Sequence, residues 1–126
     1  MPVSLLAELG LNNQPGLMLI APPDSVLAEA GRLSPRPSVA PSLRHAEPAQ
    51  CICWWPERDL LTAESLSRLH WMISLGQGEA WLVTDPTDED SVAIESLRNA
   101  LDGTRLTVTD ERQLEDGSIA LRCAPS

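Results

Sequence analysis

The sequence predicts an α/β protein with a mostly parallel sheet between two layers of helices, a three-layer Rossmann-like sandwich. Short apolar runs of strand length alternate with segments of helical periodicity, and such alternation is typical of parallel strands joined by helical crossovers. Only a turn separates the last two strand-like segments, which predicts an antiparallel hairpin at the C-terminal edge. The chain of 126 residues is expected to form one domain around one core.

The chain begins with a short helix and a buried strand. Residues 3–9 carry leucines on one helical face, and Gly10 follows at the position where helices commonly end. Residues 17–21 form a continuous apolar run between Pro-Gly and Pro-Pro, which is typical of a strand buried on both faces.

A second helix and a proline-rich loop are expected next. Asp24 is a suitable N-cap for a helix over residues 25–30, and Gly31 is its expected stop. Four prolines fall within residues 32–49, and proline fits neither a helix interior nor a strand ladder. This segment is therefore predicted to be a loop, with a short edge strand near residues 42–45.

Residues 50–55 form the second predicted buried strand. Alternation places Cys51, Cys53 and Trp55 on one face of the sheet, and Trp54 points to the other. Because both faces are apolar, this strand is expected to be central.

Helix and strand alternate again in the second half of the chain. Thr62 is expected to cap a helix over residues 63–75, which Gly76 ends. A strand over residues 79–84 follows, then a helix over residues 91–101.

The last two strands are predicted to pair with each other. Residues 105–110 alternate, with Leu106 and Val108 on one face, as in a strand with one solvated side. A Glu-Asp-Gly turn then brings residues 118–123 back alongside.

Charge and cysteine usage exclude several classes of function. The net charge is −9, and the nine basic residues are all arginines without a cluster in the sequence, which argues against binding to nucleic acid or anionic membranes. A neutral or basic partner is expected instead. Three cysteines, with no cationic and apolar leader after Met1-Pro2, predict a reducing, cytoplasmic setting. No apolar run approaches the ~20 residues that span a bilayer.

The cysteines raise the question of a metal or thiol site. Cys51, Cys53 and Cys123 could gather, with His45 or His70 adding a ligand. Structural zinc sites, however, normally use C-x-x-C pairs on turns, and buried cysteine is common as a small hydrophobe. We therefore predict that the thiols belong to the core and that no metal is bound.

A cofactor site would lie after the first buried strand. Open α/β sheets bind nucleotides or S-adenosylmethionine there, with glycines that let backbone N–H groups approach the ligand. Here Pro22 and Pro23 remove two donors, and the next glycine is Gly31. The sequence predicts no bound cofactor and, without a nucleophile beside a base, no acyl-transfer activity.

The strongest functional candidate is the end of the central strand, residues 55–59, and the acidic turn 85–90 is a second candidate. In one interpretation Trp55 protrudes into the crevice of the sheet; in the other, Trp54 and Trp55 pack beneath opposite helix layers. The carboxylates of the turn are explained without a metal by the following helix N-terminus. The predicted interaction residues are Trp55, Pro56, Arg58, Asp85 and Asp88.

Short motifs along nearly the whole chain carry a resemblance to a known family. They are Glu8-Leu9-Gly10-Leu11, Pro15-Gly16, Trp54-Trp55, Gly78 with the strand through Trp81, and Leu121-Arg122-Cys123-Ala124-Pro125. In these the chain resembles the small actinobacterial proteins of domain of unknown function 3052. The resemblance implies a cut-down Rossmann methyltransferase topology and no particular activity, and residues 34–48 have no counterpart in it.

The sequence thus favours a non-enzymatic, cytoplasmic interaction or regulatory protein on a cofactor-less Rossmann-like fold, with a protein partner. The alternative is a divergent methyltransferase-like enzyme that binds S-adenosylmethionine or a nucleotide. A structural or assembly subunit is a third hypothesis. The sequence leaves the oligomeric state open, a homo-oligomer included.

Overall fold

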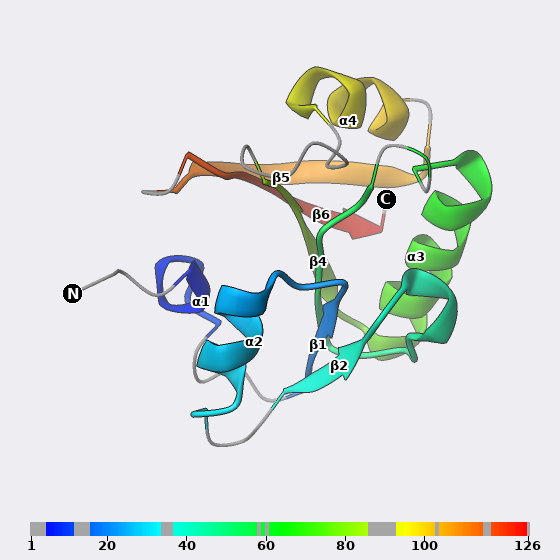
Figure 1. The fold of residues 1–126 in the computed structure, drawn as a ribbon. Coiled ribbons are helices and arrows are strands. Elements are labelled where there is room, and N and C mark those ends of the chain that lie inside the picture. The colour runs from blue at the N-terminus through cyan, green and yellow to red at the C-terminus, as the bar shows by residue number, and fades with distance from the viewer. Residues whose placement is uncertain are drawn as a thin grey trace.

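A computed structural model of the chain has the three-layer α/β architecture, with one twisted sheet between two helical layers (Figure 1). The structure describes residues 5–11, 16–33, 37–57, 59, 61–85, 93–102, 104–114 and 117–125. Within these ranges, no helix has both the length and the apolar character to cross a membrane.

The helices and strands follow one another in the predicted alternation. They are α1 (Leu5–Glu8), β1 (Leu17–Ile20), α2 (Asp24–Ala30), β2 (Ser38–Ala40), the 3-10 turn η1 (Leu43–His45), β3 (Cys51–Trp54), α3 (Ala63–Gly76), β4 (Glu79–Thr84), α4 (Ile94–Leu101), β5 (Leu106–Gln113) and β6 (Ile119–Pro125).

The sheet has the strand order β2-β1-β3-β4-β6-β5. The pairs β1–β2, β1–β3 and β3–β4 are parallel, as helical crossovers require. Strand β6 is antiparallel to both of its neighbours, β4 and β5, so the predicted C-terminal hairpin is confirmed. The short β2 and the longer β5 form the two edges.

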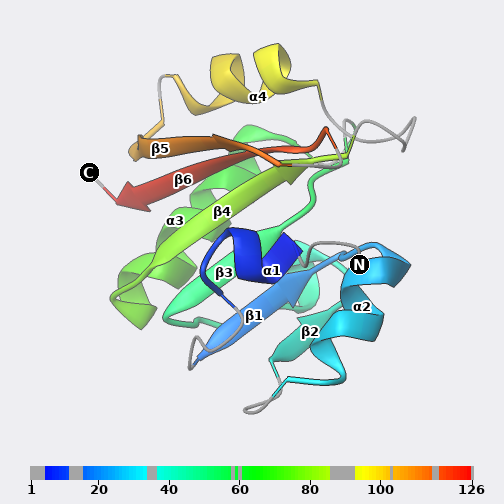
Figure 2. The same ribbon diagram turned by 90° about the vertical axis from the view of Figure 1, so that its left-hand side faces the viewer.

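Each face of the sheet carries its own apolar core. Helices α3 and α4 cover one face, and α1 and α2 cover the other; in Figure 2, α1 lies in front of the sheet and α3 behind it. Strand β3 contributes to both cores, because Ile52 and Trp54 point to the α3 side and Cys51, Cys53 and Trp55 to the α1 side. The predicted central strand with two buried faces is confirmed.

In the connection from α3 to β4, the backbone lies very close to another segment at two glycines. Helix α3 starts at a capping box, in which the Ser65 backbone N–H donates to the Thr62 hydroxyl at 3.1 Å, as expected for Thr62. At the other end, a Cβ on Gly76 or Gly78 would lie less than 3.0 Å from backbone atoms of Ala49 or Gln50. Both glycines are therefore needed for packing.

Helix α3 ends at Gly76, but Gly76 is not the left-handed residue that commonly terminates a helix. Gly76 is still helical, and Gln77 adopts the left-handed conformation, with φ of 54°. The helix ends in this way because close packing requires glycine on both sides of the turning residue, and the left-handed position falls to Gln77 between them.

The start and end of α2 also differ from the prediction. Asp24 is the first helical residue, and Pro23, without a side-chain hydrogen bond, occupies the N-cap. The fixed φ of Pro23, −68°, suits an extended cap, and its carbonyl accepts from the backbone N–H groups of Val26 and Leu27. Gly31 has φ of −64°, so it supplies no left-handed stop.

The edge strand of the proline-rich loop lies earlier than predicted. It is β2, at residues 38–40, whereas the predicted residues 42–45 contain the 3-10 turn η1. Arg68 of α3 holds this segment, since its guanidinium donates to the carbonyl oxygens of Leu43, Arg44 and Ala46 at 3.1 to 3.4 Å. The segment can thus satisfy its carbonyls without pairing as a strand.

The prediction that Leu106 and Val108 share the buried face of the first hairpin strand holds for one of the two residues. Leu106 is buried, but the side chain of Val108 is 42% exposed. The register between β5 and β6 shifts between Val108 and Asp110, and such a bulge re-aims the side chains on an edge strand.

We predict that the glycines beside Gln77 cannot be replaced. Gly78→Ala should lower the free energy of unfolding by about 3 kcal/mol or more, because the new methyl would overlap backbone rather than a flexible side chain. Gln77→Gly should raise it by about 0.5–1 kcal/mol, because it relieves a left-handed non-glycine residue. Urea unfolding of both variants measures this; the reverse order of stability would contradict the role assigned to each residue.

Candidate functional site

The parallel strands β1, β3 and β4 end at a small pocket, which we call the carboxyl-edge pocket. It has a volume of about 130 Å³. Its lining residues are Ala21, Pro22, Pro23, Trp55, Pro56, Glu57 and Asp85. This is the position at which open α/β sheets bind ligands, but sites for drug-sized molecules usually measure ~300–1,000 Å³.

Trp55 lines this pocket, but its side chain is buried and does not project from the sheet. Trp55 is 6% exposed, belongs to the core on the α1 side, and its backbone N–H donates to the Ile20 carbonyl at 3.1 Å. Trp54 is buried in the opposite core. The two tryptophans therefore pack beneath opposite helix layers, and the protruding Trp55 of the alternative interpretation is not what the structure contains. Pro56 is buried as well.

The turn after β1 is the second wall. Ala21 has φ of 53°, a conformation that glycine adopts more easily, and it precedes proline, which restricts its backbone further. Its N–H donates to the Ala40 carbonyl at 2.9 Å and so extends the β1–β2 pairing. Neither Pro22 nor Pro23 can offer a backbone donor to a phosphate or carboxylate ligand.

The rim of the carboxyl-edge pocket is acidic. Glu57 and Asp85 line the pocket, none of its described lining residues is basic, and Asp59 nearby is exposed. Of the other predicted interaction residues, Arg58 and Asp88 lie outside the described residues. The described part of the predicted site therefore consists of a buried aromatic wall and a carboxylate rim.

The three thiols do not form one cluster. Cys51 and Cys53 lie in the core on the α1 side and Cys123 in the core on the α3 side, so the sheet separates them. Among the residues that the structure describes, no group of three His, Cys, Asp or Glu side chains is placed to hold a metal ion. The prediction that the thiols belong to the core is confirmed.

Burial makes these thiols poor nucleophiles. Desolvation, with a contribution from Glu79 partly offset by Arg122, raises the pKa of Cys51 to about 11. Desolvation raises the pKa of Cys123 to about 12 and that of Cys53 well above its usual value. Each thiol is therefore protonated at neutral pH.

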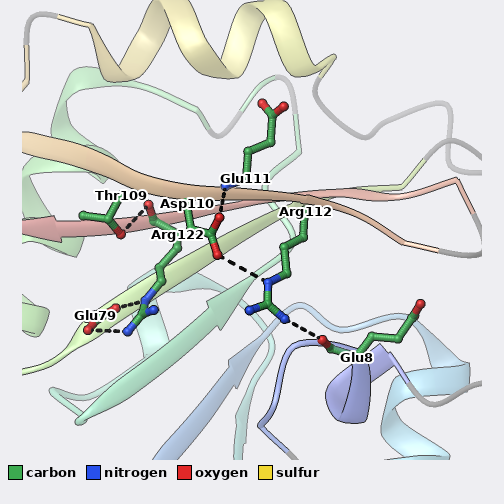
Figure 3. Close-up of polar contacts among 7 residues, drawn as sticks. All are labelled: Glu8, Glu79, Thr109, Asp110, Glu111, Arg112 and Arg122. Carbon is green, nitrogen blue, oxygen red and sulfur yellow. Dashed lines mark hydrogen bonds and ion pairs between the residues drawn. The ribbon is translucent and has the colours of Figure 1, made fainter.

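A polar cluster lies toward the other end of the sheet, on the face that α1 covers (Figure 3). In the strand register, Trp81 of β4 is opposite Arg122 of β6, and Arg122 is opposite Asp110 of β5. Arg112 lies two residues beyond Asp110 and therefore on the same face. The guanidinium carbons of Arg112 and Arg122 lie 5.7 and 6.0 Å from the centroid of the Trp81 ring.

Acidic groups and a helix end hold both arginines. Arg122 donates through Nε and Nη2 to the two carboxylate oxygens of Glu79, and these hydrogen bonds raise the pKa of Arg122. Arg112 donates to Asp110 at 3.3 Å and to the carbonyl of Glu8, the last residue of α1, at 2.9 Å. Arg112 thus links β5 to a helix 104 residues earlier in the chain.

The cluster borders a larger hollow, the amino-edge cavity, with a volume of about 580 Å³. Its walls include Gln50, Cys51, Gln77, Gly78, Glu79, Trp81, Arg112 and Arg122. Sequence reasoning missed this site because the arginines are scattered along the chain. The available signal was the turn at Gly117, which brings Arg112 and Arg122 together on one face of a hairpin.

Comparison with known proteins identifies the fold. No family model and no curated protein matches the chain. A crystal structure of OxaC superposes with a TM-score of 0.55 at 10% identity, over 91% of this chain and 43% of OxaC, so the chain spans less than half of that protein. The magnesium protoporphyrin IX methyltransferase ChlM from Synechocystis PCC 6803, with bound SAM, superposes with a TM-score of 0.53 at 12% identity, over 96% of this chain and 74% of ChlM.

At these identities the likeness concerns the fold. The chain has a mixed α/β, Rossmann-like fold similar to that of a methyltransferase. The resemblance to domain of unknown function 3052 stays a prediction.

The thiols predict how stability changes in alkali. Lysine and tyrosine are absent, so from about pH 9 to pH 11 the cysteines are the side chains that titrate. The unfolded chain releases the Cys51 proton from about pH 8.5, whereas the folded protein retains it to about 11. Stability should therefore be complete below about pH 8.5 and fall above it by up to about 1.4 kcal/mol per pH unit for each thiol.

Urea unfolding at a series of pH values under reducing conditions measures this loss. Cys51→Ala should reduce the slope by the contribution of one thiol. A free energy of unfolding that stays constant across the same range would show that the thiols are not buried as described.

Proposed function

We propose that the protein is a non-enzymatic, cytoplasmic interaction protein whose carboxyl-edge pocket receives one basic side chain of a protein partner. The single observation that carries the proposal is the composition of this pocket of about 130 Å³: its described lining includes Trp55, Glu57 and Asp85, and none of its described lining residues is basic. A cation between an aromatic face and carboxylates gains both cation–π and ionic interactions.

The overall charge supports the same kind of partner. The net charge of −9 would attract a basic surface and accelerate its association at low ionic strength. Pro22, Pro23 and Pro56 limit the backbone motion around the pocket, so little ordering would oppose binding. Arg58 and Asp88 are proposed, with Trp55, Pro56 and Asp85, to belong to the same interaction surface.

The alternative is binding of S-adenosylmethionine in this crevice, which the likeness to ChlM with bound SAM favours. The volume of the described pocket and the two prolines after β1 argue for the first proposal. The two functions make different demands, since a cofactor requires space and backbone donors whereas a basic side chain requires carboxylates.

We predict that charge reversal at the rim abolishes partner capture. Glu57 is exposed, so Glu57→Lys should fold normally, and it would repel a basic side chain at the pocket. Glu64→Lys, an equal charge change at an exposed position in the first turn of α3, is the matched control. Wild type and Glu64→Lys should capture the same partner from an extract of the native host, and Glu57→Lys should lose it. Equal capture by all three proteins would contradict the proposal.

We also predict that S-adenosylmethionine and S-adenosylhomocysteine leave thermal stability unchanged. A ligand present at ~100 times its Kd would stabilise the folded state by about 2.7 kcal/mol, which a melting experiment detects readily. A concentration-dependent rise in Tm with either compound would support the methyltransferase-like alternative instead.

A further inference from the structure

The amino-edge cavity is distinct from the carboxyl-edge pocket and, unlike the described lining of that pocket, contains arginine side chains. Its lining includes the guanidinium groups of Arg112 and Arg122 and the carboxylate of Glu79. Asp110, which pairs with Arg112, lies outside this lining, so the lining itself contains two basic side chains and one acidic one. Gln50 and Gln77, which are neutral, also line the cavity.

Both arginines retain hydrogen-bonding capacity after their protein contacts. A guanidinium has five N–H donors. In the described part of the chain, Arg112 uses two of them, for Asp110 and Glu8, and Arg122 uses two, for Glu79. Their side chains are 47% and 41% exposed, so a small ligand can reach the donors that remain.

The two guanidinium groups are also held in place before any ligand arrives. Both lie over the ring of Trp81, which is buried, and the contacts in Figure 3 tie each one to a neighbouring strand or helix. An arginine that is already oriented loses little side-chain entropy when it binds an oxyanion. Carboxylate and phosphate oxygens match the guanidinium geometry best.

The size of the cavity suits a small molecule. Its volume of about 580 Å³ lies within the usual range of ~300–1,000 Å³ for ligand sites. Gly78 is one of the residues that line it.

We propose that the amino-edge cavity binds a small anionic molecule through a carboxylate or phosphate group held by Arg112 and Arg122. Glu79 and Asp110 position the two guanidinium groups. This site would act independently of the carboxyl-edge pocket, so its test does not depend on that of the proposed function.

Calorimetric titration with citrate and, separately, with inorganic phosphate tests this proposal, at an ionic strength kept constant with chloride. At least one of them should bind saturably to the wild-type protein. Arg112→Gln and Arg122→Gln should each weaken binding by ~10-fold or more, because each removes charge-assisted hydrogen bonds to the anion. Binding of citrate alone would assign a carboxylate ligand, and binding of phosphate alone a phosphorylated one.

Arg98→Gln is the matched control. Arg98 lies on α4 and pairs with Glu111, outside the lining of the cavity, so this variant loses the same charge and should bind within about 2-fold of wild type. Circular dichroism checks that each variant is folded. Arg122→Lys keeps the positive charge but loses the bidentate guanidinium group, so it should bind the anion more weakly than wild type. The absence of saturable binding of both anions to wild type, or an equal loss in Arg98→Gln, would overturn the proposal.

Discussion

The close backbone approach at Gly76 and Gly78 is the constraint on which the rest of the structure depends. With no side chain on either residue, the turn after α3 lies directly against Ala49 and Gln50, and the Glu79 N–H donates to the Gln50 carbonyl at 3.1 Å. This contact begins the parallel pairing of β3 with β4 and places Cys51 opposite Glu79 and Cys53 opposite Trp81. This register determines which side chains of β4 lie at each end and on each face of the sheet, because a shift of one residue would exchange the two faces of β4.

At the carboxyl end, the ends of β1, β3 and β4 enclose a small pocket. The strand that precedes it buries one tryptophan on each face, so the indole of Trp55 supports the α1-side core and at the same time lines the pocket. Ala21 and the prolines occupy the position where a cofactor-binding sheet has glycine and free backbone donors. In a fold similar to that of a methyltransferase, this edge thus lacks backbone donors at Pro22 and Pro23.

At the amino end, the β5–β6 hairpin places basic groups that are distant in sequence over one aromatic ring. Part of this site could have been expected from the sequence: strand alternation around the turn at Gly117 puts Arg112 and Arg122 on one face. Three further relations could not. The insertion of β6 between β4 and β5 brings Arg122 beside Trp81 and Glu79. The bulge after Val108 shifts the register of β5, so that Asp110 is opposite Arg122 and Arg112 lies diagonally from it. The position of α1 supplies the Glu8 carbonyl. Each depends on contacts between segments far apart in the chain.

The sequence by itself determined the α/β class, the alternating faces of β3, the span of β4 and the burial of the thiols, because these follow from local periodicity and from the positions of glycine and proline. Only the tertiary structure decided that β2 lies at residues 38–40 rather than 42–45, that Gln77 rather than a glycine turns left-handed, and that Trp55 is a wall rather than a projection. In each case the physical reason is a long-range contact. The carbonyls of η1 bind Arg68, Gly76 and Gly78 contact Ala49 and Gln50, and the Trp55 indole fills the core beneath α1 and α2. No local sequence pattern encodes which distant group a residue will contact.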